Sequence, residues 1–211
     1  MKWAMLLWLA AVATAADLRL IEAVKKQDLA AVRTLIAQRA DLNAAEPDGF
    51  TALHWAAQRS NSQIADLLLT AGAKADAASR YKITPLSLAA TNGNAAIIER
   101  LLKAGVDANR TSEQGQTALM TAAMTGAPDA VRVLLANGAK VNATEPLQDQ
   151  TALMWAASEG RTEAAALLVE FGANVKAKTK GGFTPLLFAV RNGHIAAAKL
   201  LLDHGANVND V

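Results

Sequence analysis

The sequence predicts an all-α fold, a solenoid of six stacked helix pairs with β-hairpin finger loops. Two signals predict it: a Thr-(Ala/Pro)-Leu triplet, and a Gly after a Leu-rich run. The triplet begins at Thr51, Thr84, Thr117, Thr151 and Thr184, with spacings of 33, 33, 34 and 33 residues. The Gly column is Gly72, Gly105, Gly138, Gly172 and Gly205. Two motifs locked to one period indicate stacked copies of one supersecondary unit.

The first residues form a pattern typical of a secretory signal peptide. Lys2 precedes an uncharged, mostly apolar run over residues 3–16, shorter than the roughly 20 residues of a membrane-spanning helix. Ala13 and Ala15 place small residues where a signal peptidase reads them. We expect cleavage after residues 1–15 and no stable membrane insertion afterwards. An uncleaved anchor and a buried first helix are the alternatives.

The mature chain, residues 16–211, is expected to be one repeat domain of six units. Their approximate boundaries are 17–48, 49–81, 82–114, 115–148, 149–181 and 182–211. The first unit lacks the Thr triplet, but its Arg39-Ala40 pair lies 33 residues before Gly72-Ala73. Terminal repeats are commonly atypical in this way.

Each unit begins with a short helix. The Thr51 hydroxyl can cap its first turn, where Pro85 also fits. Leu53, Ala56 and Ala57 fall on one helical face, so the Ala pair allows neighbouring helices to approach closely. A Gly that tolerates positive φ is predicted to end this helix. These residues are Gly93, Gly126, Gly160 and Gly193.

A second helix follows, and Pro128 marks its entry in one unit. Its core column is Leu68, Leu101, Leu134, Leu168 and Leu201. A Gly-Ala pair closes the helix. About ten irregular residues then return the chain to the next Thr, which is long enough for a projecting hairpin.

These units resemble the ankyrin repeat, with the pattern G-x-T-P-L-H-x-A-A-x-x-G-H followed by I-V-x-L-L-L-x-x-G-A-x-x-N. The resemblance covers residues 18–209 and implies paired antiparallel helices, hairpin fingers and a curved stack with a concave face. The sequence departs from the pattern at Ser60, where Gly is expected, and at Lys176, which replaces the last Asn. The loop 143–150 has one extra residue.

Little in the composition points to catalysis, and we expect no enzyme activity, cofactor or metal. The absence of Cys excludes disulfides and thiolate nucleophiles. The three His residues lack metal-ligand spacing, and no phosphate-binding or nucleophile motif is present. Net charge is +2, from 21 basic and 19 acidic residues, too balanced for nucleic-acid binding. A basic group near the C-terminal end is interpreted as a solvated rim: Lys176, Lys178, Lys180 and Arg191.

Two further features are interpreted as structural. His54 occupies the His column, and the resemblance implies that it supports the turn through hydrogen bonds. The pairs Glu46-Pro47 and Glu145-Pro146 recur at similar finger positions, where Pro stiffens a loop.

The resemblance implies that a protein partner contacts the finger tips and the exposed side of the first helices. Aromatic residues are the expected apolar anchors, because they bury large areas at low entropic cost. They are Phe50, Trp55, Tyr81, Trp155 and Phe183. The expected polar rim is Arg59, Arg80, Gln114, Glu159 and Arg191. The alternative is that the aromatic residues only pack against neighbouring helices or brace hairpins.

The last unit keeps an apolar helix pair, including Phe188 and Ile195, where a terminal repeat usually presents a polar face. Either this end frays, or something packs on it.

Together these features predict a non-enzymatic interaction scaffold, exported to the periplasm of a Gram-negative bacterium or secreted. The alternatives are a secreted effector that acts outside the producing cell, and an accessory or small-ligand-binding subunit of an envelope enzyme.

Overall fold

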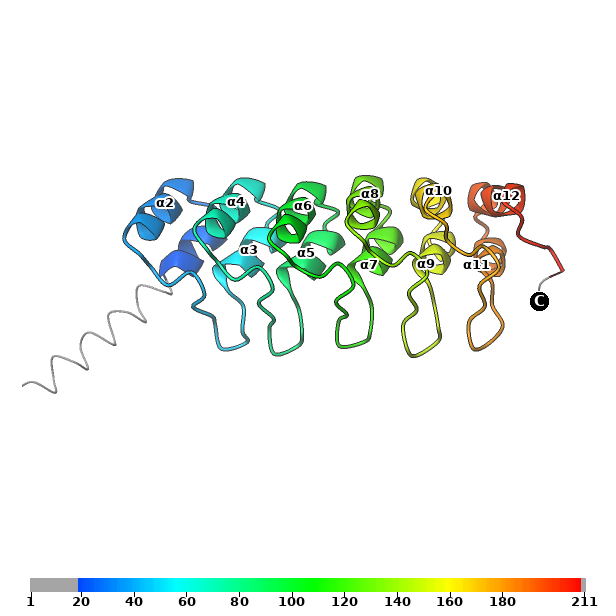
Figure 1. Ribbon diagram of the computed structural model, residues 1–211, viewed down its shortest axis with the longest axis horizontal. Coiled ribbons are helices and arrows are strands. Elements are labelled where there is room, and N and C mark those ends of the chain that lie inside the picture. Colours follow the sequence, from blue (N-terminus) through cyan, green and yellow to red (C-terminus); the bar gives the residue numbers. More distant parts are fainter. Residues whose placement is uncertain (1–18, 210–211) are drawn as a thin grey trace, which may run out of the picture.

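The computed structural model describes residues 19–209 and contains two parallel layers of helices with loops projecting from one edge (Figure 1). The layer next to the loops contains the first helix of each unit. After the helical residues 19–25, these are α3 (Ala52–Gln58), α5 (Pro85–Thr91), α7 (Ala118–Thr125), α9 (Ala152–Ser158) and α11 (Pro185–Arg191). The other layer contains α2 (Leu29–Ala37), α4 (Ser62–Thr70), α6 (Ala95–Lys103), α8 (Pro128–Ala136), α10 (Thr162–Glu170) and α12 (Ile195–Asp203).

The first helices begin where the Thr column predicts. The Thr84 side chain accepts a hydrogen bond from the N–H of Ser87 at 3.1 Å, and the Ser87 hydroxyl accepts from the N–H of Thr84 at 3.0 Å. This reciprocal capping satisfies two helix-end donors that otherwise lack partners. Pro85 occupies the first helical position, as predicted, and Pro185 does the same in the last unit.

Positive φ at one position ends each first helix. Gly93 has φ +64° and Gly126 has φ +75°. Ser60, the residue that departs from the repeat pattern, adopts the same conformation with φ +54°. The backbone geometry is therefore kept at a local cost, since the left-handed region disfavours a residue with a Cβ by roughly 1–2 kcal/mol.

The core runs without interruption along the stack. The Leu column of the second helices is fully buried at Leu68, Leu101, Leu134, Leu168 and Leu201. The Ala pairs of α3, α5, α7 and α9 are also fully buried. Small side chains on this face allow the close approach of neighbouring first helices that the sequence predicts.

Side-chain amides bridge consecutive units at the return to the fingers. The Asn43 Oδ1 accepts from the N–H of Lys74 at 2.7 Å, and the Asn109 Oδ1 accepts from the N–H of Lys140 at 2.7 Å. These bonds join the loop of one unit to the start of the next loop at these two junctions.

The finger loops are hairpins with very short pairing. Isolated antiparallel bridges close three of them, at Ala45–Thr51, Thr111–Thr117 and Thr144–Thr151, and the described residues contain no longer strand. The loop 143–150 accommodates its extra residue within the finger, where Asp149 has φ +59°.

Substitution of a central core residue tests the stack. Leu134→Ala should destabilise the protein by roughly 2–5 kcal/mol, because it leaves a cavity between units packed on both sides. Leu201→Ala should cost less, since the last unit has one neighbour in the stack. Chemical denaturation of both variants measures the difference. A larger loss at Leu201 would contradict the nearest-neighbour model of this stack.

Candidate partner-binding face

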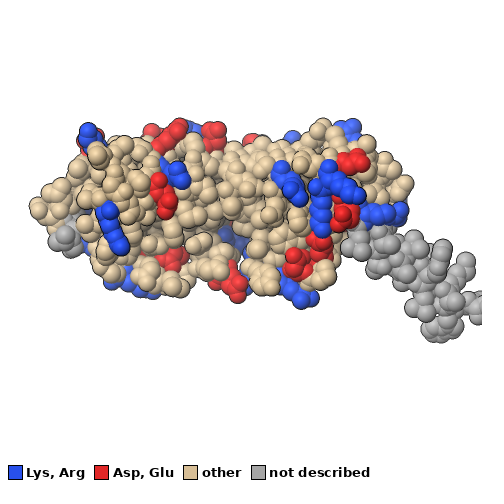
Figure 2. All heavy atoms as spheres, turned by 180° about the vertical axis from the view of Figure 1, so that it is seen from behind, with Lys and Arg blue, Asp and Glu red and all other residues tan. Residues whose placement is uncertain are grey.

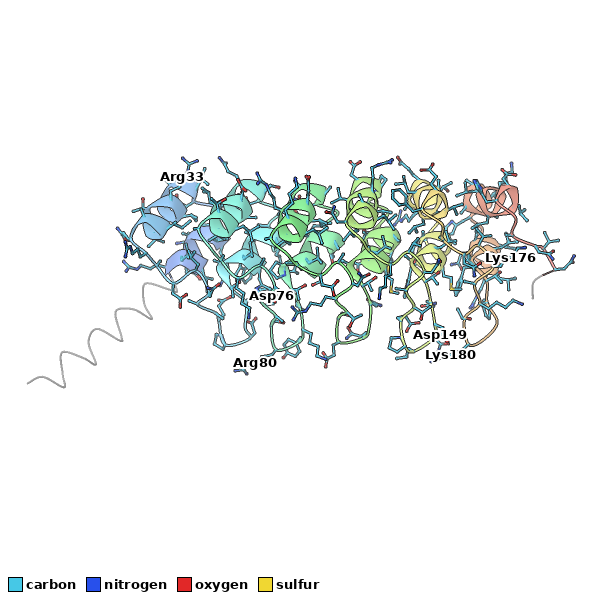
Figure 3. The ribbon with its side chains drawn as sticks, in the orientation of Figure 1. Arg33, Asp76, Arg80, Asp149, Lys176 and Lys180 are labelled. Atoms are coloured by element: carbon cyan, nitrogen blue, oxygen red, sulfur yellow. The ribbon has the colours of Figure 1, made fainter. Side chains whose placement is uncertain are left out.

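The candidate site is the finger face, which we define as the surface formed by the finger loops and the exposed side of α3, α5, α7, α9 and α11. Arg80, Asp149 and Lys180 lie at the finger tips, whereas Arg33 lies on α2 at the opposite edge of the molecule (Figure 3). Because corresponding positions of each unit face the same way, residues far apart in sequence share this surface.

The predicted site residues differ in exposure. Tyr81 is 65% exposed, and Trp55, Trp155 and Phe183 are half-buried. Phe50 is only 9% exposed and therefore offers little area to a partner. The predicted rim is exposed throughout: Arg59, Arg80, Gln114, Glu159 and Arg191. Leu147, which was not among the predicted anchors, is 69% exposed on the fourth finger.

His54 connects two units. Its Nδ1 accepts from the N–H of Thr51 at 3.1 Å, and its Nε2 lies 3.1 Å from the carbonyl oxygen of Ile83. The carbonyl requires a donor, so Nε2 carries the proton. Burial lowers the pKa of His54 below its usual value, which favours this neutral ring. The side chain therefore supports the turn, as the resemblance implies.

Trp55 lies in a network of charges. Its Nε1 donates to the Glu46 carboxylate at 2.7 Å, and the same carboxylate pairs with Lys25 at 2.6 Å. The Lys25 ammonium lies 4.7 Å from the centre of the Trp55 ring, and Phe50 packs edge-on at 5.7 Å. The hydrogen bond to Glu46 raises the pKa of Lys25. The Lys25 charge is thus paired within the chain, whereas the exposed Arg59 guanidinium lies 6.0 Å from the Trp55 ring centre.

A related cluster lies on the last unit. The Phe183 and Phe188 rings are 5.6 Å apart, and the Arg191 guanidinium lies 5.7 Å from the Phe183 ring centre. They border a pocket of about 220 Å³ between the fourth and fifth fingers. Its lining is Gln148, Gln150, Thr179, Gly181, Phe183, Phe188 and Arg191.

Glu145 organises the fourth finger. Its buried carboxylate accepts from the N–H groups of Leu147, Gln148 and Gln150 at 2.7, 2.9 and 3.0 Å. Burial raises the pKa of this carboxyl, but the three N–H donors and Lys180 outweigh it, so the pKa lies below its usual value. The interpretation of the Glu-Pro pair as Pro stiffening alone therefore missed the role of the carboxylate.

The extra residue in this loop also affects Trp155. Glu46 lies nine residues before Trp55, whereas Glu145 lies ten residues before Trp155. With Glu145 bound to its own finger, the Trp155 Nε1 is buried and has no acceptor among the described residues.

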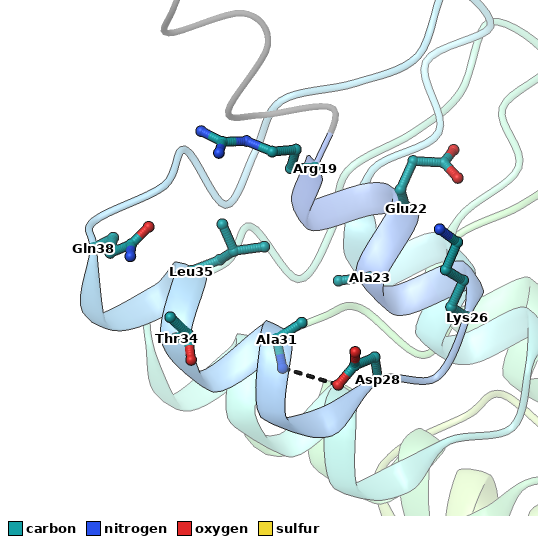
Figure 4. Close-up of a pocket in the computed structure, with 9 residues that line it drawn as sticks. All are labelled: Arg19, Glu22, Ala23, Lys26, Asp28, Ala31, Thr34, Leu35 and Gln38. Atoms are coloured by element: carbon teal, nitrogen blue, oxygen red, sulfur yellow. Dashed lines mark hydrogen bonds between the residues drawn. The ribbon is translucent and has the colours of Figure 1, made fainter.

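The two ends of the stack differ. At the N-terminal end, a hollow of about 460 Å³ lies between residues 19–25 and α2, where Arg19, Glu22, Lys26 and Asp28 place charges around an apolar floor (Figure 4). The C-terminal end is apolar. Its exposed large apolar residues are Val190 (59%), Ile195 (70%), Leu202 (40%) and Val208 (68%). A packing contact at this end stays a prediction.

Lys and Arg are interspersed with Asp and Glu on the face seen in Figure 2, and no basic stripe crosses it. Within residues 19–209, no group of His, Cys, Asp and Glu is arranged to hold a metal ion. None of the helices in this part of the chain is long and apolar enough to span a bilayer.

Comparison with known proteins agrees with this geometry. A family model described as ankyrin repeats (3 copies) matches residues 71–145 and 143–211, and a second, ankyrin repeats (many copies), matches residues 20–69. The chain belongs to the ankyrin repeat family.

Among solved structures, the chain is similar to the ankyrin repeat domain of Bcl-3, a member of the IkappaB protein family. That match has a TM-score of 0.80 and 27% sequence identity, and it covers 90% of this chain and 86% of the other. A search of curated proteins found no match. Ankyrin repeats generally mediate protein–protein interactions, and the fold is typically a non-enzymatic scaffold.

The Glu145 network predicts a pH-dependent stability. Glu145→Gln should destabilise the protein by about 1–3 kcal/mol at neutral pH, because buried N–H groups lose a charged acceptor. A carboxyl whose folded pKa is lowered stabilises the fold above its unfolded pKa, and this contribution is lost as pH falls through the folded pKa.

Urea unfolding of the unsubstituted protein and of Glu145→Gln should therefore show a difference in the free energy of unfolding that becomes smaller at acid pH. Glu113→Gln, at an exposed position of the third finger, is the control, and its stability should differ little from that of the unsubstituted protein at either pH. If Glu145→Gln lowers the free energy of unfolding by the same amount in acid as at neutral pH, the ionised Glu145 carboxylate does not stabilise the finger as assigned.

Proposed function

We propose that this protein is a scaffold that binds a protein partner through its finger face. The observation that carries the proposal is the exposure of Tyr81 and Leu147 on the finger loops, beside half-buried aromatic residues on the first helices. Large exposed apolar side chains framed by polar ones mark contact surfaces.

Within this face, Trp55, Tyr81, Trp155 and Phe183 act as the apolar anchors. Phe50 contributes indirectly, since it packs between His54 and Trp55 and braces the ring that the partner contacts. The exposed rim residues Arg59, Arg80, Gln114, Glu159 and Arg191 set specificity around these anchors.

We further propose that the scaffold is exported to the cell envelope, in the periplasm or as a secreted protein. The support is the sequence pattern of residues 1–15, which lies outside the described residues. The same pattern suits a secreted effector, which remains the alternative location for the same binding function.

Tyr81→Ala and Phe183→Ala test the binding face. Each should reduce capture of the partner from cell extract strongly, because a central anchor contributes roughly 2 kcal/mol or more. The free energy of unfolding should change little in Tyr81→Ala, because the Tyr81 ring is mostly exposed. Phe171→Ala is a matched aromatic control, since Phe171 is 42% exposed at the end of α10 in the other helix layer. Full capture by both folded variants would exclude the finger face.

Export is tested separately by cell fractionation and sequencing of the mature N-terminus. The expected mature chain begins at Ala16 and is found outside the cytosol. Cytosolic protein that retains Met1 would contradict export while leaving the binding function standing.

A further inference from the structure

Two clusters on the finger face occupy the same columns of the repeat, four units apart. In the first, Phe50 packs against Trp55, and in the last, Phe183 packs against Phe188. The ring centres are 5.7 and 5.6 Å apart. Lys25 and Arg59 lie 4.7 and 6.0 Å from the Trp55 ring centre in the first cluster, and Arg191 lies 5.7 Å from the Phe183 ring centre in the last. The two aromatic pairs therefore repeat one arrangement, whereas the cations beside them come from different positions of the repeat.

The first cluster contains its own carboxylate. Glu46 pairs with Lys25 at 2.6 Å and accepts the Trp55 Nε1 proton at 2.7 Å. Glu46 is available for these contacts because Asp48 accepts the N–H of Phe50 at 3.0 Å, a bond that the residue at the Glu46 position accepts in the other fingers. In the first cluster, a carboxylate thus pairs with the cation that lies beside the aromatic rings.

The last cluster lacks this group. Thr179 stands at the position of Glu46, seven residues after the positive-φ residue that ends the second helix. Its hydroxyl accepts the N–H of Phe183 at 3.0 Å. Arg191 is exposed, forms no ion pair within residues 19–209, and contacts the Phe183 ring. A guanidinium with a free edge is suited to a carboxylate.

The space beside Arg191 is open and its walls are held in place. The N–H of Lys180 donates to the carbonyl oxygen of Gln148 at 3.0 Å, which joins the fourth and fifth fingers. The Lys180 ammonium donates to the carbonyl oxygens of Pro146 and Leu147, so its charge is directed to the neighbouring finger. The pocket of about 220 Å³ between these fingers is therefore preorganised.

We propose that this pocket binds an acidic residue in an extended segment of the protein partner. Its carboxylate pairs with the Arg191 guanidinium, and its neighbouring apolar atoms pack on Phe183 and Phe188. Gln148 and Gln150 also line the pocket, and their amides can hydrogen-bond the backbone of the segment. This inference rests on the proposed function, and it names the chemistry of the partner at one end of the finger face.

The experiment is selection of random peptides displayed on phage against the purified protein that begins at Ala16. Selected sequences should be enriched in Asp and Glu next to apolar residues. For a selected peptide, replacement of the acidic residue by its amide should weaken binding by about 5-fold or more, the effect of a little under 1 kcal/mol per charged contact. Arg191→Gln should abolish this difference between the acid and the amide. Arg33→Gln, on the other helix layer, should preserve it.

The inference would be overturned if the selected peptides were not enriched in Asp and Glu. It would also be overturned if the acidic peptide still bound more tightly than its amide variant to the Arg191→Gln protein. If those peptides still require Tyr81, the finger face binds as proposed and only the chemistry of this pocket is wrong. Failure to select any peptide would reject an extended peptide as the partner, whereas the Tyr81→Ala and Phe183→Ala capture experiment would still test the binding face.

Discussion

The packing of alanine-faced first helices against one another is the contact on which the rest of the structure depends. Ala56 and Ala57 and the Ala pairs of α5, α7 and α9 are fully buried, and they contribute no side chain beyond Cβ. Small side chains on this face therefore let neighbouring first helices pack closely along the stack. This repeated approach brings the finger loops into register, so that Arg80 can hydrogen-bond Asp48 and Lys180 can hydrogen-bond Gln148 between adjacent fingers.

Each finger also needs an acceptor for its own N–H groups, and one column of the repeat supplies it. Ser79, Ser112 and Thr179 use hydroxyls, and Glu145 uses a carboxylate. Glu46 occupies this column but binds Lys25 and Trp55 instead. The finger face therefore differs between units where the residue at this position binds another group in place of the N–H groups of its own finger.

The aromatic residues illustrate why a repeated position does not have a repeated role. Trp55 and Trp155 share a column, yet the Trp55 indole N–H has a carboxylate acceptor and that of Trp155 has no acceptor within residues 19–209. Phe50 and Phe183 also share a column, but Phe50 is buried under His54 and Trp55, whereas Phe183 borders an open pocket. Neighbouring side chains decide whether each ring serves packing or binding.

The sequence by itself determined the number of units, the helix starts at the Thr column and the buried Leu column. These features are local or strictly periodic, because capping, positive φ and helical spacing act within one unit. Exposure of the face was also predictable, since Tyr81 and the rim lie on loops and outer helix positions.

Only the tertiary structure decided which aromatic side chains remain accessible and which charges are already paired. The pairing of Lys25 with Glu46 joins residues 21 positions apart, and the Glu46 carboxylate also binds Trp55 of the next unit. The direction of the Glu145 carboxylate depends on how one extra loop residue is accommodated. Such contacts depend on distances of a few ångströms between side chains far apart in the sequence. A repeat pattern in the sequence does not give these distances. For the same reason, the unpaired Arg191 beside its aromatic pocket became visible only in the folded stack.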